Sequence, residues 1–325
     1  MNQRTLRVGL TAILCALVLR LFAAGVPGRL LSRLNESKIA SFFLSVETGR
    51  KVRFSPSIEA FSPDFMESPA PATMPPTEPP LPGFSAAEDV KVYNASGKSP
   101  DIGALLESPL RWELRGEEPT VLILHTHTTE SYTKNGEQYT ESAAWRTRDE
   151  NYNMLSIGER LREKLEENGI IAIQDRTIHD YPSYNGSYTH ARESIRAYLE
   201  AYPTIRLVLD LHRDASGGSG AQMKTKATVD GKPSAQLMVV VGGSHEEYEE
   251  NLSLGLKLQA ALEEEHPGVT RPLQIRGARY NQDMLGGALL IEVGAAGNSR
   301  AEALTAAEAL AEGITVLARG TGEPE

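Results

Sequence analysis

Three apolar runs that end in polar residues limit the fold of this chain more than any other feature does. They lie at residues 121–125 (VLILH), 206–212 (RLVLDLH) and 288–294 (ALLIEVG). Short apolar runs of this kind are typical of buried parallel strands. Each run therefore predicts a strand whose carboxyl end presents polar side chains.

Helical spacing of apolar residues lies between and after these runs. Met154, Ile157, Leu161 and Leu165 recur at intervals of three and four residues and stop at Gly169, which predicts an amphipathic helix. Three further helices are predicted, and residues 225–242 predict two strands around an Asp-Gly turn. The further helices are expected over residues 189–202, 246–266 (with Ser244 as a cap) and 300–319 (with Asn298 or Ser299 as a cap). Strands that alternate with helices indicate one α/β domain over residues 90–325.

The first 28 residues have the composition of a membrane anchor. Arg4 and Arg7 precede an apolar run over residues 8–26, and a helix needs about 20 apolar residues to span a bilayer. Arg20 lies towards the far end, where its side chain can extend to the interface. We expect residues 1–28 to be an uncleaved anchor with a cytoplasmic N-terminus. A cleaved signal peptide is the alternative, and both place the rest of the chain outside the cytoplasm.

Residues 29–89 are expected to connect this anchor to the domain as a juxtamembrane segment and linker. Proline is dense over residues 55–83, which excludes helix and strand and favours an extended spacer. The net charge of -10 argues against nucleic acid as a partner. Cys15 is the only cysteine, so a disulfide framework and a cysteine zinc cluster are both excluded.

Titratable side chains gather at the predicted strand ends. His125, His127, His212 and Glu292 all fall at or near carboxyl ends, where α/β sheets carry their sites. His125 and His127 are two residues apart, so they can share one face of a strand. Two histidines and a carboxylate would hold a zinc ion with one open position, and Glu292 is the candidate general base. Taken singly, each histidine could instead be a hydrogen-bonded structural residue, and Glu292 a salt-bridge partner.

Four segments together resemble the stage II sporulation protein P family. They are LHTHTTESY, LDLHRDA, RYNQDM and LLIEVGAAGN. The family consists of membrane-anchored peptidoglycan hydrolases related to the zinc-dependent N-acetylmuramoyl-L-alanine amidases. The resemblance covers most of residues 90–319, and it implies a central, mostly parallel sheet flanked by helices. It also implies a zinc ion (Zn2+) held by two histidines and one acidic residue.

The resemblance assigns a role to each position that matches the amidase motifs. It implies that His127 and His212 are metal ligands and that Glu292 is the catalytic glutamate. The third ligand falls on Asp149, four residues before an asparagine that opens a helix. The amidases commonly have glutamate there, so this sequence departs from their pattern, and Glu150 and Glu130 remain alternatives.

The remaining positions are expected around the metal ligands. We expect His125 to line the pocket of His127, where it would position the substrate or support a metal ligand. We expect Glu130 to hold in place the residues that surround the ligands. Residues 279–282 (RYNQ) resemble a loop of the family. Arg279 and Asn281 in this loop are candidates to contact the carboxylates of a stem peptide, and turn structure is the alternative reading of the loop.

The resemblance implies an amidase that cleaves the bond between N-acetylmuramic acid and the stem peptide at the sporulation septum during engulfment. It also implies a partner, the lytic transglycosylase called stage II sporulation protein D, and a second cleavage within peptide cross-links. Two alternatives remain open at this point. One is a wall-binding scaffold without activity, and the other is a zinc peptidase that acts on stem peptides.

Overall fold

The computed structural model describes residues 90–110, 113–133, 146–215 and 223–320 of the chain. The expected membrane anchor (residues 1–28) and the linker (residues 29–89) lie outside these ranges. Within the described ranges, no helix combines the length and the hydrophobicity that crossing a bilayer requires.

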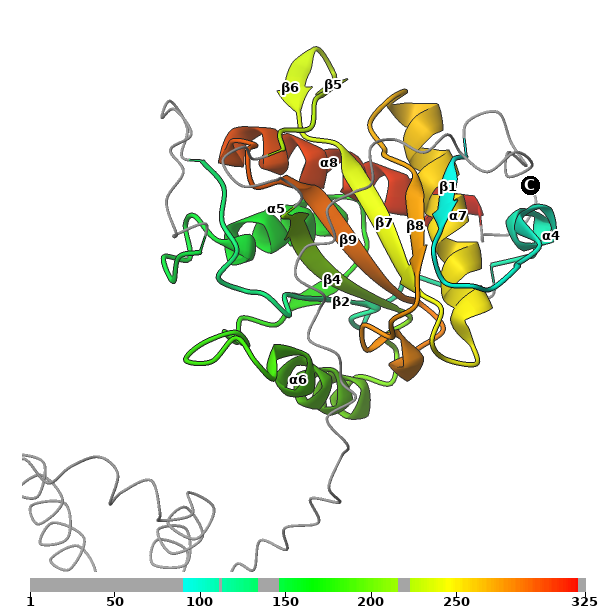
Figure 1. Cartoon of the computed structure of the whole chain (residues 1–325), viewed down its shortest axis with the longest axis horizontal. Helices are drawn as coiled ribbons and strands as arrows, with labels where there is room; N and C mark the ends of the chain where they lie inside the picture. Colours follow the sequence, from blue (N-terminus) through cyan, green and yellow to red (C-terminus); the bar gives the residue numbers. More distant parts are fainter. Residues whose placement is uncertain (1–89, 111–112, 134–145, 216–222, 321–325) are drawn as a thin grey trace, which may run out of the picture. The chain divides into compact units, whose positions relative to one another are not determined.

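A seven-stranded sheet forms the centre of the described residues, with the strand order β1-β8-β7-β9-β4-β2-β3 (Figure 1). Its strands are β1 (Val92–Asn94), β2 (Val121–Leu124), β3 (Ala172–Gln174), β4 (Leu207–Asp214), β7 (Leu237–Gly242), β8 (Leu273–Arg276) and β9 (Ala288–Ala295). Neighbouring strands are parallel except β7 and β9, which are antiparallel. The prediction of an α/β domain with a mostly parallel sheet is confirmed.

Helices connect the strands. They are α4 (Ile102–Glu107), α5 (Met154–Glu167), α6 (Ser187–Ala201), α7 (Tyr248–Glu265) and α8 (Arg300–Gly320), with a short 3-10 helix η1 (Gln282–Met284). Helices α5, α6, α7 and α8 lie where the sequence predicts helices, whereas α4 is not predicted. Ser299 caps α8: its hydroxyl accepts from the Glu302 N–H at 3.3 Å, and the Glu302 carboxylate accepts from the Ser299 N–H at 2.9 Å, a capping box. Ser244 does not cap α7, because that helix begins after Glu247.

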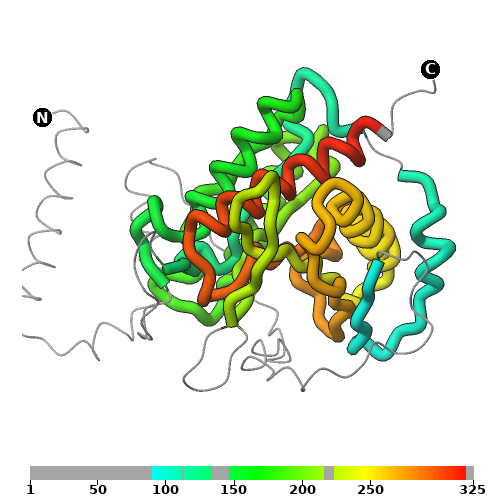
Figure 2. The backbone as a smooth tube through the Cα atoms, turned by 90° about the horizontal axis from the view of Figure 1, so that it is seen from above, coloured from blue at the N-terminus to red at the C-terminus, as the bar shows by residue number. Residues whose placement is uncertain are grey.

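The two faces of the sheet are covered unequally. Helices α5, α7 and α8 lie on one face of the sheet, and α6 lies on the other (Figures 1 and 2). Ile123 and Leu209 point into the large core cluster with residues of α5, α7 and α8. Leu122, Leu124 and Val208 point the other way, into a smaller cluster with α6. Alternate residues of one strand face opposite sides of a sheet, so we name these the three-helix face and the α6 face.

A hairpin projects from the loop between β4 and β7. Strands β5 (Ala227–Val229) and β6 (Lys232–Ser234) pair antiparallel. Asp230 and Gly231 connect them with φ angles of 50° and 74°, the left-handed pair that tight hairpins favour. The Asp-Gly turn is therefore where the sequence predicts it. The apolar run that follows forms the separate strand β7 instead of the second arm of the hairpin.

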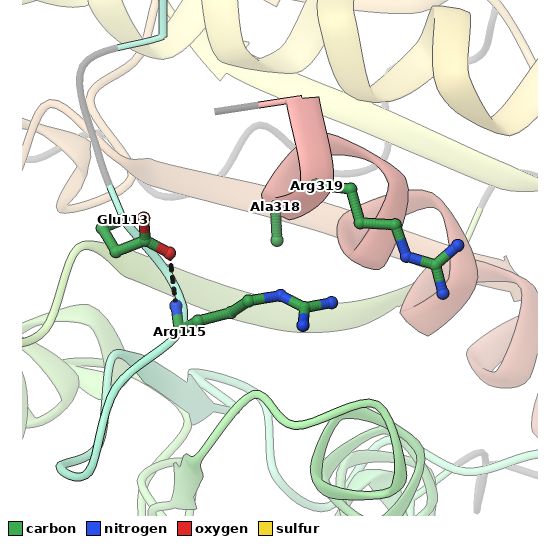
Figure 3. Close-up of a pocket in the computed structure, with 4 residues that line it drawn as sticks. All are labelled: Glu113, Arg115, Ala318 and Arg319. Carbon is green, nitrogen blue, oxygen red and sulfur yellow. Dashed lines mark hydrogen bonds between the residues drawn. The ribbon is translucent and has the colours of Figure 1, made fainter. Parts of the chain in front are cut away.

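Two hollows lie away from the carboxyl ends of β2, β4 and β9. One, of about 420 Å³, lies at the last turn of α8 between Glu113, Arg115, Ala318 and Arg319 (Figure 3). The other, of about 520 Å³, lies beside Gly286 and Gly287, just before β9 begins. Neither contains a histidine among its lining residues, so the predicted chemistry is not in either.

Candidate active site

The register of β4 and β9 brings His212 and Glu292 together. The two residues are direct partners in this parallel pair, so their side chains leave the same face of the sheet from strands about 4.8 Å apart. His212 is four residues after Val208 on β4, so its side chain is on the same face as that of Val208, the α6 face, and so is that of its partner Glu292. His212 is buried, and Oε2 of Glu292 is buried without a hydrogen-bond partner.

His127 approaches the same place from the turn after β2. Its ring lies 5.1 Å from the ring of His212, centre to centre, at an interplanar angle of 87°. Its Nε2 is 3.0 Å from the hydroxyl of Tyr184, and its Nδ1 is 3.3 Å from the hydroxyl of Ser187. Tyr184 lies just before α6, and Ser187 is the first residue of that helix. The structure thus brings His127, His212 and Glu292 into one cluster.

Glu130 is the acidic residue that joins this cluster. One carboxylate oxygen, Oε2, is 3.5 Å from Nδ1 of His212 and accepts a hydrogen bond from the Arg213 N–H at 3.2 Å. The other oxygen, Oε1, accepts from Arg146 at 3.3 Å. Glu130 is only 4% exposed, so these contacts fix its position.

A second carboxylate, Asp210, lies on the other side of the His212 ring. Its Oδ1 is 3.1 Å from Nε2 of His212, but the direction does not suit a hydrogen bond, and Nε2 has no hydrogen-bond partner. Thr126 holds Asp210 through its N–H at 2.8 Å and its hydroxyl at 2.6 Å. His212 therefore sits between two buried carboxylates.

These neighbours set the charges of the cluster. Burial opposes a charge on His212, but Asp210 and Glu130 outweigh it and raise its pKa well above the ordinary value. Burial opposes the charge of Glu130 too, yet Arg213 and His212 hold its pKa far below the ordinary value. Burial lowers the pKa of His127 to about 4. Burial first, and then the charge of Asp214, raise the pKa of Glu292 to about 8.

His125 lies on the opposite face of the sheet, so the expectation that it shares the pocket of His127 is wrong. It is two residues after Ile123, and its side chain lies on the same face as that of Ile123, the three-helix face; it is 1% exposed. Its Nε2 is 2.9 Å from Nε2 of Gln174, and its ring lies so close to Gly158 that a Cβ built there would be 2.6 Å from Nε2. Strand β2 ends at Leu124. His127 lies beyond the end of this strand, so the alternation of side chains along β2 does not determine on which face it lies.

Asp149 makes its side-chain contacts within its own turn and not with the histidines of the cluster. Asp149 is exposed and accepts hydrogen bonds from the backbone and side chain of Asn151 at 3.0 Å. Its short side chain is thereby used within its own turn. Glu150 is exposed too and pairs with Arg176. Of the three acids that the sequence offers as a ligand, Glu130 is the one that contacts His212.

The RYNQ loop reaches the cluster through aromatic rings. Tyr280 and Asn281 have φ angles of 52° and 57°, an uncommon conformation for residues other than glycine. The Tyr280 ring lies 6.0 Å from that of Tyr188, which lies 6.4 Å from that of His212. Asn281 is 8% exposed and donates to the Tyr188 carbonyl at 2.7 Å, so it holds the loop against α6.

Arg279 has the exposure that a residue binding a peptide carboxylate needs. Its side chain is 46% exposed, and its guanidinium lies 3.9 Å from Asp283. Asp283 is already bound by Arg192 at 2.8 Å. Arg279 therefore stands at the edge of the loop with only a long ion pair.

Sequence reasoning missed the residues that surround the cluster. Asp210 carries a signal, since a charged residue inside an apolar strand needs a partner. Arg146, Tyr184, Ser187 and Tyr188 carry none, because they come from loops and helix starts whose positions depend on the folded chain.

The side chains of His127, Glu130 and His212 are of the types that bind a metal ion, although their nitrogen and oxygen atoms do not point to one common position. In the described ranges, no three histidine, cysteine or acidic side chains have the arrangement of a metal site. The 3.5 Å between Nδ1 of His212 and Oε2 of Glu130 matches the spacing of about 3.3 Å between two ligands of a tetrahedral zinc ion. A ligand histidine must be neutral: the lowered pKa of His127 suits this, but its nitrogens face hydroxyl groups. His212, whose pKa is raised, would have to give up its proton to the ion. The donor set is suitable if His127 turns.

A comparison with protein families identifies the relatives of the chain. Residues 77–315 match the family model for stage II sporulation protein P, and the chain belongs to that family. The stage II sporulation protein P of Bacillus subtilis (strain 168) is 31% identical over 210 residues. That match covers 61% of this chain and 50% of the relative, so the chain spans about half the length of that relative.

Several solved amidase structures resemble the chain at low similarity. An N-acetylmuramoyl-L-alanine amidase from Clostridium difficile 630 is 18% identical with a TM-score of 0.39, covering 64% of this chain and 100% of that one. The CwlD amidase from Clostridioides difficile, solved in complex with the GerS lipoprotein, is 15% identical with a TM-score of 0.40, covering 62% and 99%. These scores are too low to carry a functional argument.

Proposed function

We propose that this protein is a metal-dependent peptidoglycan hydrolase of sporulation that cleaves the amide bond between N-acetylmuramic acid and L-alanine. One observation carries the proposal. The carboxylate of Glu292, whose Oε2 atom is buried without a hydrogen-bond partner, stands directly beside a histidine that contacts the buried carboxylate of Glu130. A protein does not normally bury such groups together unless they serve a site.

His127, Glu130 and His212 are the residues that we propose to hold the metal. They combine two imidazoles and one carboxylate, the donor set of many catalytic zinc sites. A zinc ion there would polarise the amide carbonyl and acidify a water molecule. Asp149, which the family resemblance favours, remains the alternative third ligand, and the contact between Glu130 and His212 supports Glu130.

Glu292 is the proposed general base and acid. Its pKa of about 8 in the metal-free chain allows the carboxyl group to exchange a proton near neutral pH. It would accept a proton from the attacking water and deliver it to the nitrogen of the leaving L-alanine. Its position next to His212 is set by the strand register, so the proton acceptor is fixed before substrate arrives.

The setting of the enzyme is proposed from the sequence. We infer that residues 1–28 anchor the chain in the membrane with the domain on the outer side at the sporulation septum. The lytic transglycosylase stage II sporulation protein D as a partner, and a second cleavage in peptide cross-links, stay predictions from the family resemblance.

Digestion of intact peptidoglycan by the full chain in detergent tests the activity. With zinc added, stem peptides with a free amino group on L-alanine should be released, and mass spectrometry identifies them. A chelator should stop the release and added zinc should restore it. Products cut within the stem peptide would indicate a peptidase instead, and unaltered muropeptides from zinc-loaded protein would indicate a scaffold.

Two matched variants test the proposed ligands. Glu130→Gln should lower the zinc content of the purified protein, while Asp149→Asn should leave it unchanged. Circular dichroism checks that both variants are folded. Loss of zinc from Asp149→Asn alone would reassign the third ligand to the residue that the sequence favours.

A further inference from the structure

Two strongly exposed aromatic side chains lie on one loop beside the candidate active site. Among the described residues, the large apolar side chains with high exposure are Tyr181 at 51%, Tyr184 at 45% and Tyr202 at 36%. Tyr181 and Tyr184 belong to residues 181–186, which lead into α6. Exposed aromatic rings that gather at a site commonly mark a binding surface.

Tyr184 ties this loop to the cluster. Its ring stacks on the ring of His127, with centres 4.5 Å apart and an interplanar angle of 17°. The Arg146 guanidinium lies 4.6 Å from the centre of the Tyr184 ring. Arg146 is itself held by the buried carboxylate of Asp180 at 2.6 Å. The position of Tyr184 is therefore built into the fold.

Tyr181 repeats the arrangement further out on the loop. The Arg148 guanidinium lies 4.4 Å from the centre of its ring. Each tyrosine thus has one arginine beside it, and Arg146 and Arg148 are two residues apart. In both cases the guanidinium lies over the ring as in a cation–π pair, and the rest of each ring is exposed.

We propose that Tyr181 and Tyr184 form a surface that binds sugar rings of the glycan strand. This inference rests on the proposed function and adds the part of the substrate that the loop would recognise. The apolar C–H face of a pyranose ring packs against an aromatic ring, while its hydroxyl and N-acetyl groups accept hydrogen bonds from guanidinium groups. The amide bond to be cut is attached to a sugar, so a sugar must lie beside His127.

Binding of glycan without cleavage tests the surface. The full chain carrying Glu292→Gln is titrated with denuded glycan strands, which lack stem peptides. Tyr181→Ala and Tyr184→Ala, each added to Glu292→Gln, should weaken binding by about five-fold or more, since each loses a stacked ring. Tyr184→Phe keeps the ring and should bind as the parent does.

Tyr202→Ala is the matched control. Tyr202 follows the far end of α6, a helix of 15 residues, and is therefore about 22 Å from the loop. Its loss should leave glycan binding unchanged. Equal binding by all the tyrosine variants, or equal weakening by Tyr202→Ala, would overturn the inference.

The outcomes separate this inference from the proposed function. A protein that cleaves peptidoglycan while its tyrosine variants bind glycan normally would refute the sugar surface and keep the amidase. A protein that binds glycan through Tyr181 and Tyr184 yet releases no stem peptide would refute the amidase and keep the surface.

Discussion

The two faces of the central sheet differ in what their polar residues do. On the three-helix face, His125 is enclosed between β2 and α5 and lies 2.9 Å from Gln174. On the α6 face, His212 and Glu292 each keep a buried atom without a hydrogen-bond partner. The same sheet thus carries a satisfied histidine on one side and an unsatisfied pair on the other.

The comparison shows that the face covered by three helices forms the stable core, while the less covered face carries the candidate site. Three long helices pack on one face and complete its core, and a polar group there is tolerated only with a partner. Helix α6 covers the other face near β2 and β4, and loops surround the strand ends. Groups that must bind substrate and exchange protons can stand there without a permanent partner.

The largest effect is expected from Glu292→Gln. The variant should lose about 10³-fold in amide cleavage, within the range for removal of a general base, while still binding zinc. Product release from peptidoglycan and metal analysis of the same preparation measure the two properties. Activity within ten-fold of the parent would remove Glu292 from the mechanism.

The same variant should change how stability depends on pH. In the metal-free parent, folding raises the pKa of Glu292 from 4.5 to about 8. Between these values the folded state holds a proton that the unfolded state has lost, so stability falls as pH rises from about 4.5 to 8. Glu292→Gln should flatten this fall, as measured by urea unfolding at several pH values. An unchanged pH profile would contradict the burial of this carboxyl group.

Replacing His212 and His125 by alanine, one at a time, tests the difference between the two faces of the sheet directly. His212→Ala should lower zinc affinity by 100-fold or more, about 3 kcal/mol, because a ligand is lost. His125→Ala should keep zinc and lose about 2 kcal/mol of stability, because it leaves a cavity and removes one of the two partners of the Gln174 side-chain nitrogen. Zinc titration and urea unfolding of both variants give the answer. Zinc loss in His125→Ala would place both histidines in one site.

Gly158→Ala tests the tight packing of the three-helix face. A Cβ there would lie 2.4 Å from Nε2 of Gln174 and 2.6 Å from Nε2 of His125, so we expect a loss of about 1–3 kcal/mol. Gly103→Ala in α4 is the control, since its Cβ would meet only Asp101, at 3.6 Å. That change should be neutral or stabilising. Equal stability of the two variants would contradict the contact of α5 with His125.

The smallest effect is expected from Tyr184→Phe. The hydroxyl of Tyr184 lies 3.0 Å from Nε2 of His127, and a metal ion that uses this nitrogen must displace it. Removing the hydroxyl should raise zinc affinity by about two- to ten-fold, the value of one hydrogen bond. Competition with a chelating dye measures this. A lower affinity would mean that Tyr184 helps to hold the metal.

The sequence predicts the strands and the residues at their ends because both follow from local pattern. The apolar runs predict β2, β4 and β9, with His212 and Glu292 near their carboxyl ends. The neighbouring positions of β4 and β9, and with them the pairing of His212 and Glu292, come from the structure alone. The side of the sheet on which a residue lies is less predictable near a strand end. Alternation places His125 and His127 together, but the turn after Leu124 separates them.

The contacts that complete the cluster could not be predicted from local pattern. Glu130 reaches His212 because a turn folds back over the end of β4, and Tyr184 reaches His127 because residues 181–186 cross the same edge. These contacts join positions that are 82 and 57 residues apart. Spacing along the chain does not reveal such pairs.

The β4–β9 register also determines which changes the protein can tolerate. Backbone hydrogen bonds, not side-chain contacts, keep His212 opposite Glu292. Insertions in the long connection between these strands need not disturb the pair, whereas deleting one residue inside either strand would turn one of the two side chains into the core. Engineered chimaeras and circular permutants should therefore be cut in a loop of that connection, with β4, β9 and the strands and helix between them left intact.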